Sequence, residues 1–299
     1  MKVFLTGATG FVGSHLLKRL LRDGHEVRAL ARLRSSGLAE TAPGSSRLEW
    51  IEGDVLSPNF DSAVAGCDAV VNLVGIIREH GKQTFEAVHH QATCNLVAAA
   101  LRTGVQLFVQ MSALGARREN ASRYHITKFA AEEEVRKAAL LHVILRPSLI
   151  FGPGSAFIDQ MIGVMRAIPL VRPVPGTGKY RFRPVHVDDV AECFVQSLSN
   201  SAASGQAIDL VGAEELTLDN ITSEIAARLG VRKTVVRIPI PLMKTAARIF
   251  SILPVTPPIT PDQVRMLEEG STASPEPMQR IFGIDPIGFR AGLRQSLQR

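Results

Sequence analysis

The sequence predicts an α/β fold in which a doubly wound parallel sheet is joined to a smaller mixed lobe on its C-terminal side. Short apolar runs alternate with amphipathic stretches through the first half of the chain, which is the rhythm of parallel strands connected by helices on both faces. A glycine-rich turn at residues 6–13 separates the first strand from the first helix. Beyond Pro147 the chain becomes rich in proline and glycine, as loops that line a site often are.

The first strand, at residues 3–5, runs into a turn with three evenly spaced glycines. Gly7 permits a tight turn, Gly10 lets the backbone approach a pyrophosphate, and Gly13 allows the next helix to pack closely on the strand. The phosphates would lie at a helix N-terminus, where unpaired N–H groups favour negative charge. The turn therefore indicates a Rossmann-type dinucleotide site, with an ordinary turn as the alternative. The predicted cofactor contacts here are Gly7, Thr9, Gly10, Phe11, Val12 and Gly13.

The following elements continue the alternation of strands and helices. Strands are predicted at residues 26–31, 48–52, 69–74, 106–112 and 141–145, and helices at residues 85–103 and 124–139. A strand at residues 207–211 is expected to return to the same sheet, after residues 185–191 pass from a strand into a helix capped by an Asp. We expect residues 1–150 with 181–215 to form the dinucleotide-binding domain.

The smaller lobe is predicted from residues 151–180 with 216–299, and we expect it to bind the substrate. It should contain helices at residues 157–167, 241–253 and 261–269, a helix capped by Thr217 or Asp219, and a basic strand at residues 233–238. Phe289, Leu293 and Leu297 recur at helical spacing near the end, which predicts a helix docked on the body or, alternatively, one that binds a partner.

Composition excludes several classes of protein. The chain has 299 residues, of which 45% are apolar, enough for a sizeable core. Its three cysteines, Cys67, Cys94 and Cys193, lie too far apart for a metal knuckle and are too few for a disulfide framework. The longest apolar stretch, at residues 249–261, holds four prolines and should not span a membrane, and the basic residues near the N-terminus argue against a signal peptide. A cytoplasmic location is expected, with peripheral attachment to the inner face of the membrane as the alternative.

The charge is basic, with a net charge of +6 and a pI near 9.5. Such a surface suits a phosphorylated cofactor, nucleic acid or an anionic membrane, or is simply a solvated face. Lys and Arg are dispersed without interleaved aromatic residues, so nucleic acid is not expected as a partner. Glu132 to Glu134 are expected to lie on a solvated helix face, and no metal-binding cluster is visible.

The end of the second strand favours NADP(H) over NAD(H). NAD-binding folds commonly place an acidic residue there for the ribose 2′-OH, whereas NADP-binding folds place an Arg for the 2′-phosphate. Here the strand ends in Ala31-Arg32, with Arg34 nearby, and the nearest preceding acid, Glu26, lies at the strand's start. A guanidinium fork matches a phosphate. Arg32 is therefore the predicted 2′-phosphate ligand.

Tyr124 and Lys128 are the predicted catalytic pair. Four residues apart on a helix, they lie on one face. A phenol with an unperturbed pKa near 10 needs an adjacent cation to work as an acid or base near neutrality, and Lys128 would supply that charge. The alternative is a pair of surface residues. His186, alone among apolar neighbours, is expected to be a hydrogen-bonded core residue and not a proton shuttle.

Together these motifs resemble the extended and atypical short-chain dehydrogenases/reductases, that is, the NAD-dependent epimerase/dehydratase family. The spacing of the glycines, Tyr124-x-x-x-Lys128 and the segment at residues 145–154 carry the resemblance, which spans residues 1 to about 221. The phrases at residues 111–116 and 259–263 are similar to members related to the 39-kDa accessory subunit of respiratory complex I. That relation implies tight NADP(H) binding, sometimes without catalysis.

The resemblance implies roles for further residues. Asp54 and Val55 would contact the adenine, Leu73, Val74 and Gly75 would pass beneath the adenine-side ribose, Lys128 would hold the nicotinamide ribose, and the backbone of Pro147 and Ile150 would meet the carboxamide. A turn role is the alternative for Asp54. The family's carbonyl-polarising hydroxyl is expected at Ser112, with a structural serine as the alternative there and Ser122 as a substitute. The chain departs from the family at Phe182, where members have an Arg, and this puts a nucleotide-sugar phosphate contact in doubt.

The sequence thus predicts an NAD(P)-dependent oxidoreductase. Hydride would move between the nicotinamide and a carbonyl or carbinol carbon of a small-molecule substrate, with Tyr124, Lys128 and Ser112 as catalytic residues. The alternative is an NADP(H)-holding structural or assembly protein of quinone or respiratory metabolism, with peripheral membrane or quinone association. The basic charge and the proline-interrupted stretch at residues 249–261 are compatible with that alternative.

Overall fold

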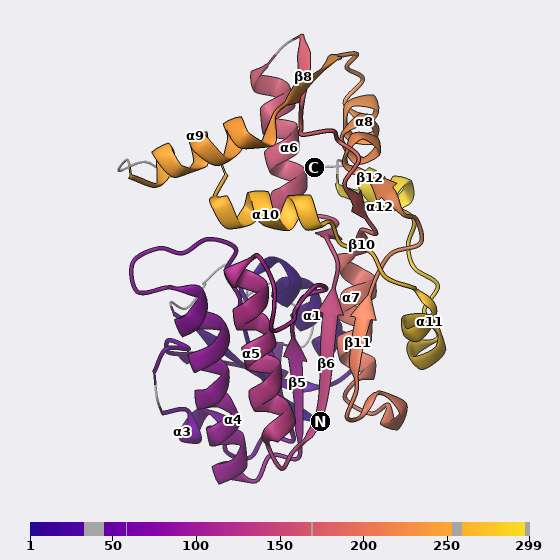
Figure 1. Cartoon of the computed structure of the whole chain (residues 1–299). Coiled ribbons are helices and arrows are strands. Elements are labelled where there is room, and N and C mark those ends of the chain that lie inside the picture. Colours follow the sequence, from indigo (N-terminus) through magenta and orange to yellow (C-terminus); the bar gives the residue numbers. More distant parts are fainter. Residues whose placement is uncertain (33–44, 58, 169, 253–258, 297–299) are drawn as a thin grey trace. The chain divides into compact units, whose positions relative to one another are not determined.

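The chain folds into two compact units (Figure 1). The computed structural model describes residues 1–32, 45–57, 59–168, 170–252 and 259–296. Unit 1 comprises Met1–Pro147, Val187–Leu210 and Glu276–Ile284. Unit 2 comprises Ser148–His186, Val211–Pro275 and Asp285–Arg299.

Unit 1 is built on a seven-stranded, fully parallel sheet, so the predicted doubly wound fold is confirmed. The strand order is β11-β6-β5-β4-β1-β2-β3. The strands are β1 (Lys2–Thr6), β2 (Glu26–Ala31), β3 (Leu48–Glu52), β4 (Ala69–Asn72), β5 (Leu107–Met111), β6 (Leu141–Pro147) and β11 (Ala207–Leu210). The chain turns in opposite directions from β1 and β4, and ligands of such folds bind outside the carboxyl ends of the strands at this point.

Helices cover both faces of this sheet. α4 and α5 lie on one face, and α1 and α7 pack together on the other (Figure 1). The bounds are α1 (Phe11–Arg22), α3 (Asp61–Val64), α4 (Ala92–Thr103), α5 (Arg123–Lys137), α7 (Val187–Gln196) and α11 (Glu276–Phe282), with short 3-10 turns η1 (Ser45–Arg47) and η3 (Ser201–Ala203). The helix predicted at residues 85–103 is not regular, because it begins as a π-helix, η2 (Glu86–Gln91).

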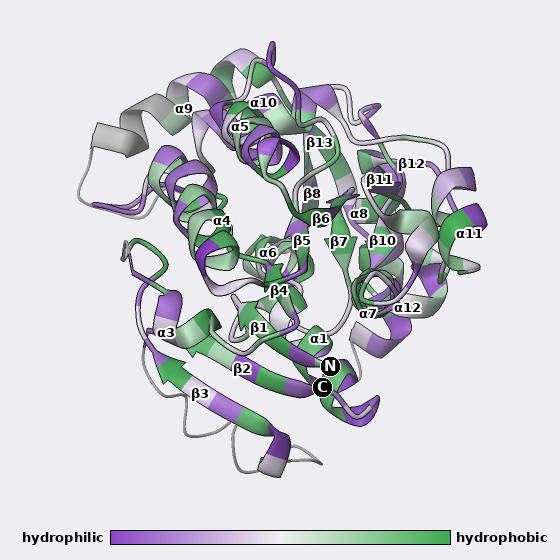
Figure 2. Ribbon diagram, turned by 90° about the horizontal axis from the view of Figure 1, so that it is seen from below, coloured by the Kyte–Doolittle hydropathy of each residue, from purple (hydrophilic) through white to green (hydrophobic). Residues whose placement is uncertain are grey.

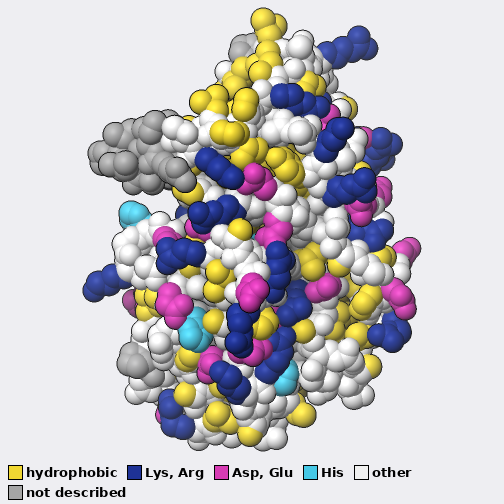
Figure 3. All heavy atoms as spheres, viewed as in Figure 1, with side chains coloured by type: hydrophobic (Ala, Val, Ile, Leu, Met, Phe, Trp, Pro, Cys, Tyr) yellow, Lys and Arg dark blue, Asp and Glu magenta, His cyan; other side chains and the backbone are white. Residues whose placement is uncertain are grey.

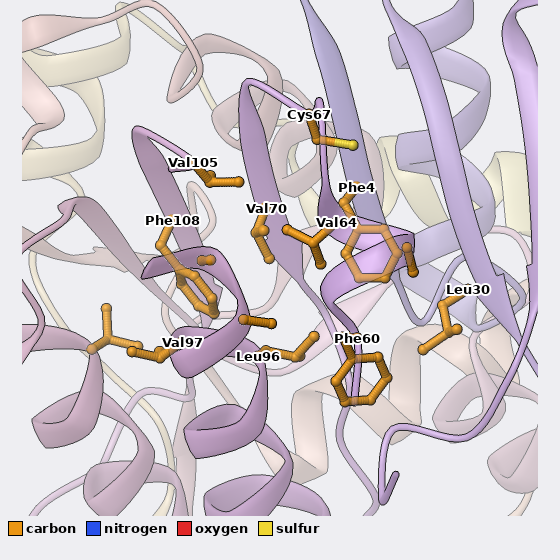
Figure 4. Packing of buried hydrophobic residues seen from close by; sticks show 14 of the residues in the cluster. Phe4, Leu30, Phe60, Val64, Cys67, Val70, Leu96, Val97, Val105 and Phe108 are labelled. Atoms are coloured by element: carbon orange, nitrogen blue, oxygen red, sulfur yellow. The ribbon is translucent and has the colours of Figure 1, made fainter. Parts of the chain in front are cut away.

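The core of unit 1 follows from the apolar runs of its central strands. Phe4, Val70 and Phe108, on three neighbouring strands, are fully buried and pack with Leu96 of α4 and Val64 of α3 (Figure 4). Toward the edge of the sheet, hydrophilic residues interrupt the hydrophobic ones in β2 and β3 (Figure 2). The last three residues of β2 are buried, whereas no residue of the edge strand β3 is fully buried.

Unit 2 has a separate core, and its described strands form two-stranded sheets. β7 (Ile150–Phe151) pairs with β10 (Val185–His186), β9 (Arg181–Phe182) with β12 (Leu216–Thr217), and β8 (Val171–Pro175) with β13 (Thr234–Ile238). The helices are α6 (Ala156–Ala167), α8 (Leu218–Arg228), α9 (Ile240–Ile252), α10 (Pro261–Glu269) and α12 (Phe289–Ser296). Of the two caps considered for α8, Thr217 is the one found, in a capping box with Asn220.

Three sequence features fall wholly or partly outside the described residues. These features are Arg34, Leu297 and residues 253–258 of the proline-interrupted apolar stretch. Within the described residues, no helix combines the length and the apolar character that crossing a membrane requires. All three cysteines are free thiols.

Candidate functional site

The glycine turn between β1 and α1 requires glycine at two of its three glycine positions. Gly7 has a φ of +74°, a conformation that favours glycine. A Cβ atom at Gly13 would lie 2.0 Å from the carbonyl oxygen of Gly7, so this backbone contact requires glycine. The amide of Gly10 donates to the same oxygen at 3.0 Å. The turn is therefore held by backbone contacts that these residue types alone permit.

The N-terminus of α1 is left open to a ligand. Its N-cap is Gly10, no side chain caps it, and no acidic residue lies in its first turn. By contrast α8 and α10 each close their N-termini with a capping box. The first N–H groups of a helix have no partners within the helix. In α1 these groups are available to an anion.

A cavity of about 210 Å³ lies beside this turn, within unit 1. Nine residues predicted to contact a cofactor line it: Gly7, Thr9, Gly10, Arg32, Asp54, Val55, Leu73, Val74 and Gly75. Phe11, Val12 and Gly13 form the first turn of α1 and do not line it. Lining residues that sequence reasoning missed are Leu30, Ala31, Gly53, Leu56, Ile76, Gln83 and Val88. Apart from Gly53, which directly precedes Asp54, these seven carry no motif that would have identified them.

Two charged residues line the cavity, and their surroundings differ. Arg32 follows β2, is exposed, and forms no hydrogen bond or ion pair with a described residue. Asp54 accepts the amide of Leu56 at 3.0 Å, which is the turn role considered as its alternative. That contact uses one carboxylate oxygen only. Arg32 is thus the cationic group that the cavity offers to an anionic ligand.

A buried polar network fixes the carboxyl ends of three central strands. Asn72 accepts the hydroxyl of Thr6 at 2.7 Å and donates to Gln110 at 3.0 Å and to Thr93 at 3.1 Å. Its oxygen also accepts the amide of Val74 at 3.3 Å. The network therefore orients the loop that carries Leu73, Val74 and Gly75 along the cavity. Gln110 and Thr93 were not identified from the sequence, because their polar groups meet only when strands far apart in the chain pair.

Lys128 reaches the same loop from α5. Its side chain is buried, and its Nζ donates to the carbonyl oxygens of Met111 at 3.1 Å and Val74 at 3.3 Å. A Cβ atom at Gly75 would lie 2.9 Å from this Nζ, so Gly75 makes room for the ammonium group. Burial lowers the pKa of Lys128 to about 8, although Glu132 acts in the opposite direction.

Tyr124 lies one helical turn before Lys128 in an aromatic setting. Its ring is edge-on to the rings of Phe85, His89 and His125, at centroid distances of 5.9, 5.1 and 5.2 Å. Burial raises the pKa of its phenol to about 12, and no nearby cation offsets that effect. The ammonium group of Lys128 donates to two carbonyl oxygens, and it does not lower the pKa of the phenol.

His89, which sequence reasoning missed, joins this site from the π-helix η2. Its Nδ1 lies 2.9 Å from the Thr127 hydroxyl, and its Nε2 lies 3.1 Å from both the amide nitrogen and the carbonyl oxygen of Ile76. The hydroxyl of Thr127 is also within hydrogen-bond distance of two backbone carbonyls of α5, so its oxygen can accept from His89 Nδ1. Burial, together with the charge of Lys128, lowers the pKa of His89 to about 2. The ring lies beside Tyr124, and its Nε2 is 3.7 Å from where a Cβ atom at Gly75 would lie.

The neutral state of His89 predicts acid sensitivity. Its folded-state pKa lies below the ordinary value of 6.5, so the stability it contributes is complete above about pH 6.5 and is lost as pH falls toward about 2. Between about pH 7 and about pH 5, the free energy of unfolding should fall by roughly 2 kcal/mol more in the wild type than in His89→Asn. Urea denaturation at the two pH values measures this difference. His90→Asn, on the neighbouring partly exposed residue, is the control. Equal acid sensitivity in wild type and His89→Asn would contradict the neutral assignment.

Ser112 lies at the end of β5, as expected, but its hydroxyl donates its proton to a carboxylate of the protein. Its hydroxyl donates to Glu132 at 2.5 Å, and Glu132 also accepts from Arg146 at 2.7 and 2.5 Å and from Arg136 at 2.7 Å. Glu132 is fully buried, so its expected place on a solvated face is wrong. The reason is that Arg146 on the neighbouring strand β6 neutralises it. In this arrangement Ser112 has no proton to offer a substrate carbonyl.

Ser122, named from the sequence as the substitute hydroxyl, occupies the N-cap of α5. Its side chain is fully buried, and its hydroxyl has no hydrogen-bond partner among the described residues. Its amide donates to Asn120 at 2.7 Å. A buried hydroxyl without a partner is rare in native proteins and calls for an explanation.

The remaining predicted residues are divided between the two units. Pro147 ends β6 in unit 1 and accepts the amide of Leu114 at 3.0 Å, whereas Ile150 begins β7 in unit 2. His186 is fully buried in unit 2, edge-on to Phe151 at 5.2 Å, which agrees with a core residue. Phe182 is also buried in that core. No cluster of potential metal ligands occurs among the residues that the structure describes.

Comparisons with known proteins give the family context. The model of the NAD dependent epimerase/dehydratase family matches residues 3–211. The mitochondrial NADH dehydrogenase [ubiquinone] 1 alpha subcomplex subunit 9 of Arabidopsis thaliana is 29% identical, over 88% of this chain and 67% of that protein. The ceramide reductase of Caulobacter vibrioides is 27% identical (86% and 80%), and the 2-alkyl-3-oxoalkanoate reductase of Stenotrophomonas maltophilia is 28% identical (99% and 98%).

Solved structures share the fold. The UDP-glucuronic acid 4-epimerase from Bacillus cereus, in complex with UDP-glucuronic acid and NAD, aligns with a TM-score of 0.75. The alignment covers 99% of this chain and 98% of that chain at 20% identity. MoeE5, in complex with UDP-glucuronic acid and NAD, aligns with a TM-score of 0.75 at 22% identity, covering 99% and 97%. At these identities the likeness concerns the fold.

Proposed function

The chain belongs to the NAD dependent epimerase/dehydratase family, and from this premise we propose that it binds NADP(H) in the cavity of unit 1 and works as an oxidoreductase. The observation that carries the proposal is the glycine turn with its uncapped helix. Gly13 and Gly7 meet through their backbones, and α1 offers its first N–H groups to an anion beside the cavity. A pyrophosphate satisfies those groups and the helix dipole together.

The preference for NADP(H) over NAD(H) rests on Arg32. This guanidinium lines the cavity at the end of β2 and is not engaged by any described residue. The only acid among the lining residues, Asp54, already accepts a backbone amide. A charged 2′-phosphate gains a charge-assisted, two-pronged contact with a guanidinium, whereas a 2′-OH gains far less.

The cofactor preference can be measured directly. We expect Arg32→Ala to weaken NADPH binding roughly 10-fold to 100-fold, the effect of losing hydrogen bonds between charged groups, and to change NADH binding less than about threefold. Fluorescence titration of both coenzymes gives the two values. Arg22→Ala, which removes an exposed guanidinium from the last turn of α1, is the matched control. Equal binding of NADH and NADPH by wild type would refute the preference.

The catalytic proposal uses Tyr124 and Lys128. Bound NADP(H) would supply or accept the hydride at the nicotinamide. Tyr124 would give its phenolic proton to the oxygen of a carbonyl substrate during reduction and take a proton from a carbinol during oxidation. Lys128, whose Nζ lies at the loop of Val74, would hold the nicotinamide ribose and stabilise the phenolate.

We assign the third hydroxyl to Ser122 in preference to Ser112. Ser112 gives its proton to Glu132, a buried carboxylate. Ser122 is buried two residues before Tyr124, and its hydroxyl lacks a partner among the described residues. A free hydroxyl proton is what the polarisation of a carbonyl requires.

The second candidate function is to hold NADP(H) as a structural or assembly protein of quinone or respiratory metabolism. Two observations favour it: the engaged proton of Ser112, and relatives that are named as subunits of NADH dehydrogenase. The deciding experiment supplies NADPH with a panel of aldehydes, ketones and quinones. Reduction that depends on Tyr124 supports the enzyme. Tight NADPH binding without any turnover supports the structural function.

A further inference from the structure

All the large hydrophobic side chains that unit 2 is found to expose lie in one region. They are Ile168, Leu170, Val235, Val236 and Leu242, with exposed fractions of 38%, 80%, 36%, 42% and 61%. Strands β8 and β13 pair in parallel, and the amide of Thr234 donates to Leu170, so the first four residues are neighbours through this sheet. Leu242 follows in the first turn of α9. We name this set the unit 2 apolar patch.

Two properties of the sheet make the patch unusual for a free surface. β8 and β13 form a two-stranded sheet, so β13 has an edge that no described strand pairs with. Four of its five residues are exposed. Exposed apolar edge strands are normally shortened, charged or covered. An exposed Leu alone is ordinary, but several exposed apolar residues close to one two-stranded sheet indicate a binding surface.

Basic residues outnumber acidic residues around the patch. Neither of the two sequence segments that build it, residues 160–187 and 225–261, contains an Asp or Glu. Arg166, Arg228 and Arg232 are exposed and form no ion pair with a described residue. Acids of neighbouring helices neutralise Arg237, through Asp219, and Lys244, through Glu268. Figure 3 shows hydrophobic side chains with Lys and Arg side chains beside them at this end of unit 2.

We propose that the unit 2 apolar patch docks on a membrane surface that contains anionic lipids. Leu170 and Leu242 would enter the boundary between headgroups and acyl chains, while Arg166, Arg228 and Arg232, which have no ion-pair partner among the described residues, would meet the lipid phosphates. This surface lies outside the cavity of unit 1 and is independent of the proposed coenzyme chemistry.

Charge favours an anionic lipid surface, and not a second copy of the chain or a nucleic acid, as the partner of the patch. In a symmetric pair of chains the same patch would meet itself, which would bring the three arginines of both copies together. Nucleic acid would use the arginines but would leave Leu170 and Leu242 without apolar contacts, and the patch has no aromatic side chain on which a base could stack. An anionic lipid surface satisfies the arginines and the leucines at once.

Vesicle flotation of the full chain tests the proposal. We expect binding to phosphatidylcholine vesicles that contain phosphatidylglycerol, little binding to phosphatidylcholine alone, and weakening by added salt. Leu170→Ser with Leu242→Ser should reduce binding roughly 100-fold, at about 10-fold for each leucine. Arg166→Gln with Arg232→Gln should reduce it roughly 25-fold, since each charge near the surface contributes about fivefold.

Matched controls come from unit 1. Leu141, exposed by 61% like Leu242, and Lys18, an exposed cation of α1, should tolerate Leu141→Ser and Lys18→Gln without loss of binding. Thermal unfolding verifies that each variant folds. Failure to float with anionic vesicles, or an equal loss in Leu141→Ser, would overturn the proposal. So would a concentration-dependent dimer that Leu242→Ser dissociates, because the occupant would then be a second copy of the chain.

Discussion

Tyr124→Phe is expected to lower kcat for carbonyl reduction by roughly 10²-fold to 10⁴-fold while the Kd for NADPH changes less than about threefold. The substitution removes one oxygen and keeps the ring, which is packed edge-on against Phe85 and His89. The lost oxygen carries the proton that the product alkoxide needs. Stopped-flow loss of NADPH absorbance gives kcat, and fluorescence titration gives Kd.

The chain offers a matched control, since its only other tyrosine is Tyr180 of unit 2. Tyr180→Phe removes the same atom from a residue outside α5 and should leave kcat within about twofold. If Tyr124→Phe and Tyr180→Phe both turn over as wild type does, Tyr124 is not the proton donor. The structural function would then gain support, provided that NADPH still binds.

The pH profile gives this prediction a second readout. Burial raises the pKa of Tyr124 to about 12 and lowers that of Lys128 to about 8. The phenol therefore keeps its proton throughout the neutral range, and the group that titrates there is Lys128. We expect kcat/KM for reduction to fall as pH rises through about 8, because Lys128 loses the charge with which it binds and polarises. If Lys128 plays no part in the reaction, kcat/KM will not fall as the pH rises through about 8.

Most of the fold could be predicted from the sequence, because local patterns indicate the helices and strands of unit 1. An apolar run, three glycines and an amphipathic stretch determine β1, its turn and α1, and the alternation that follows is that of the observed parallel sheet. The cavity was also predictable in outline, since parallel strands bring their carboxyl ends to one edge. Both predictions start from patterns that are local in the sequence, combined with the general geometry of parallel sheets.

Contacts between distant residues could not be predicted in the same way. His89 was missed because a π-helix has the same residue types as an α-helix, and its place beside Tyr124 depends on the irregular turns. Glu132 was misplaced because three consecutive glutamates on a helix are usually solvated. Its neutralising partner, Arg146, comes from the following strand and is identified only when α5 packs on β6.

Glu132→Ala is expected to destabilise the protein by roughly 3–5 kcal/mol, because it leaves Arg146 partly buried without its carboxylate and Ser112 without its acceptor. For a protein of this size, about 1 kcal/mol corresponds to roughly 2–4 °C in Tm, so the fall in Tm should be roughly 10 °C. Urea denaturation gives the free energy of unfolding. Glu133→Ala on the same helix, where the carboxylate is half-buried and contacts Arg136 alone, should cost less than about 1 kcal/mol.

A double replacement separates the loss of the ion pair from the penalty of the unpaired charge that remains. The penalty of a broken buried ion pair comes chiefly from the charge left behind, so Glu132→Leu with Arg146→Met should recover much of the stability that Glu132→Ala loses. The same carboxylate raises the pKa of Lys128 against burial, so its removal should also shift the alkaline limb of the kcat/KM profile to lower pH. A Glu132→Ala variant as stable as Glu133→Ala would show that the network carries little of the fold. An unmoved alkaline limb would show that Glu132 does not act on Lys128 and that α5 holds its ammonium group by other means.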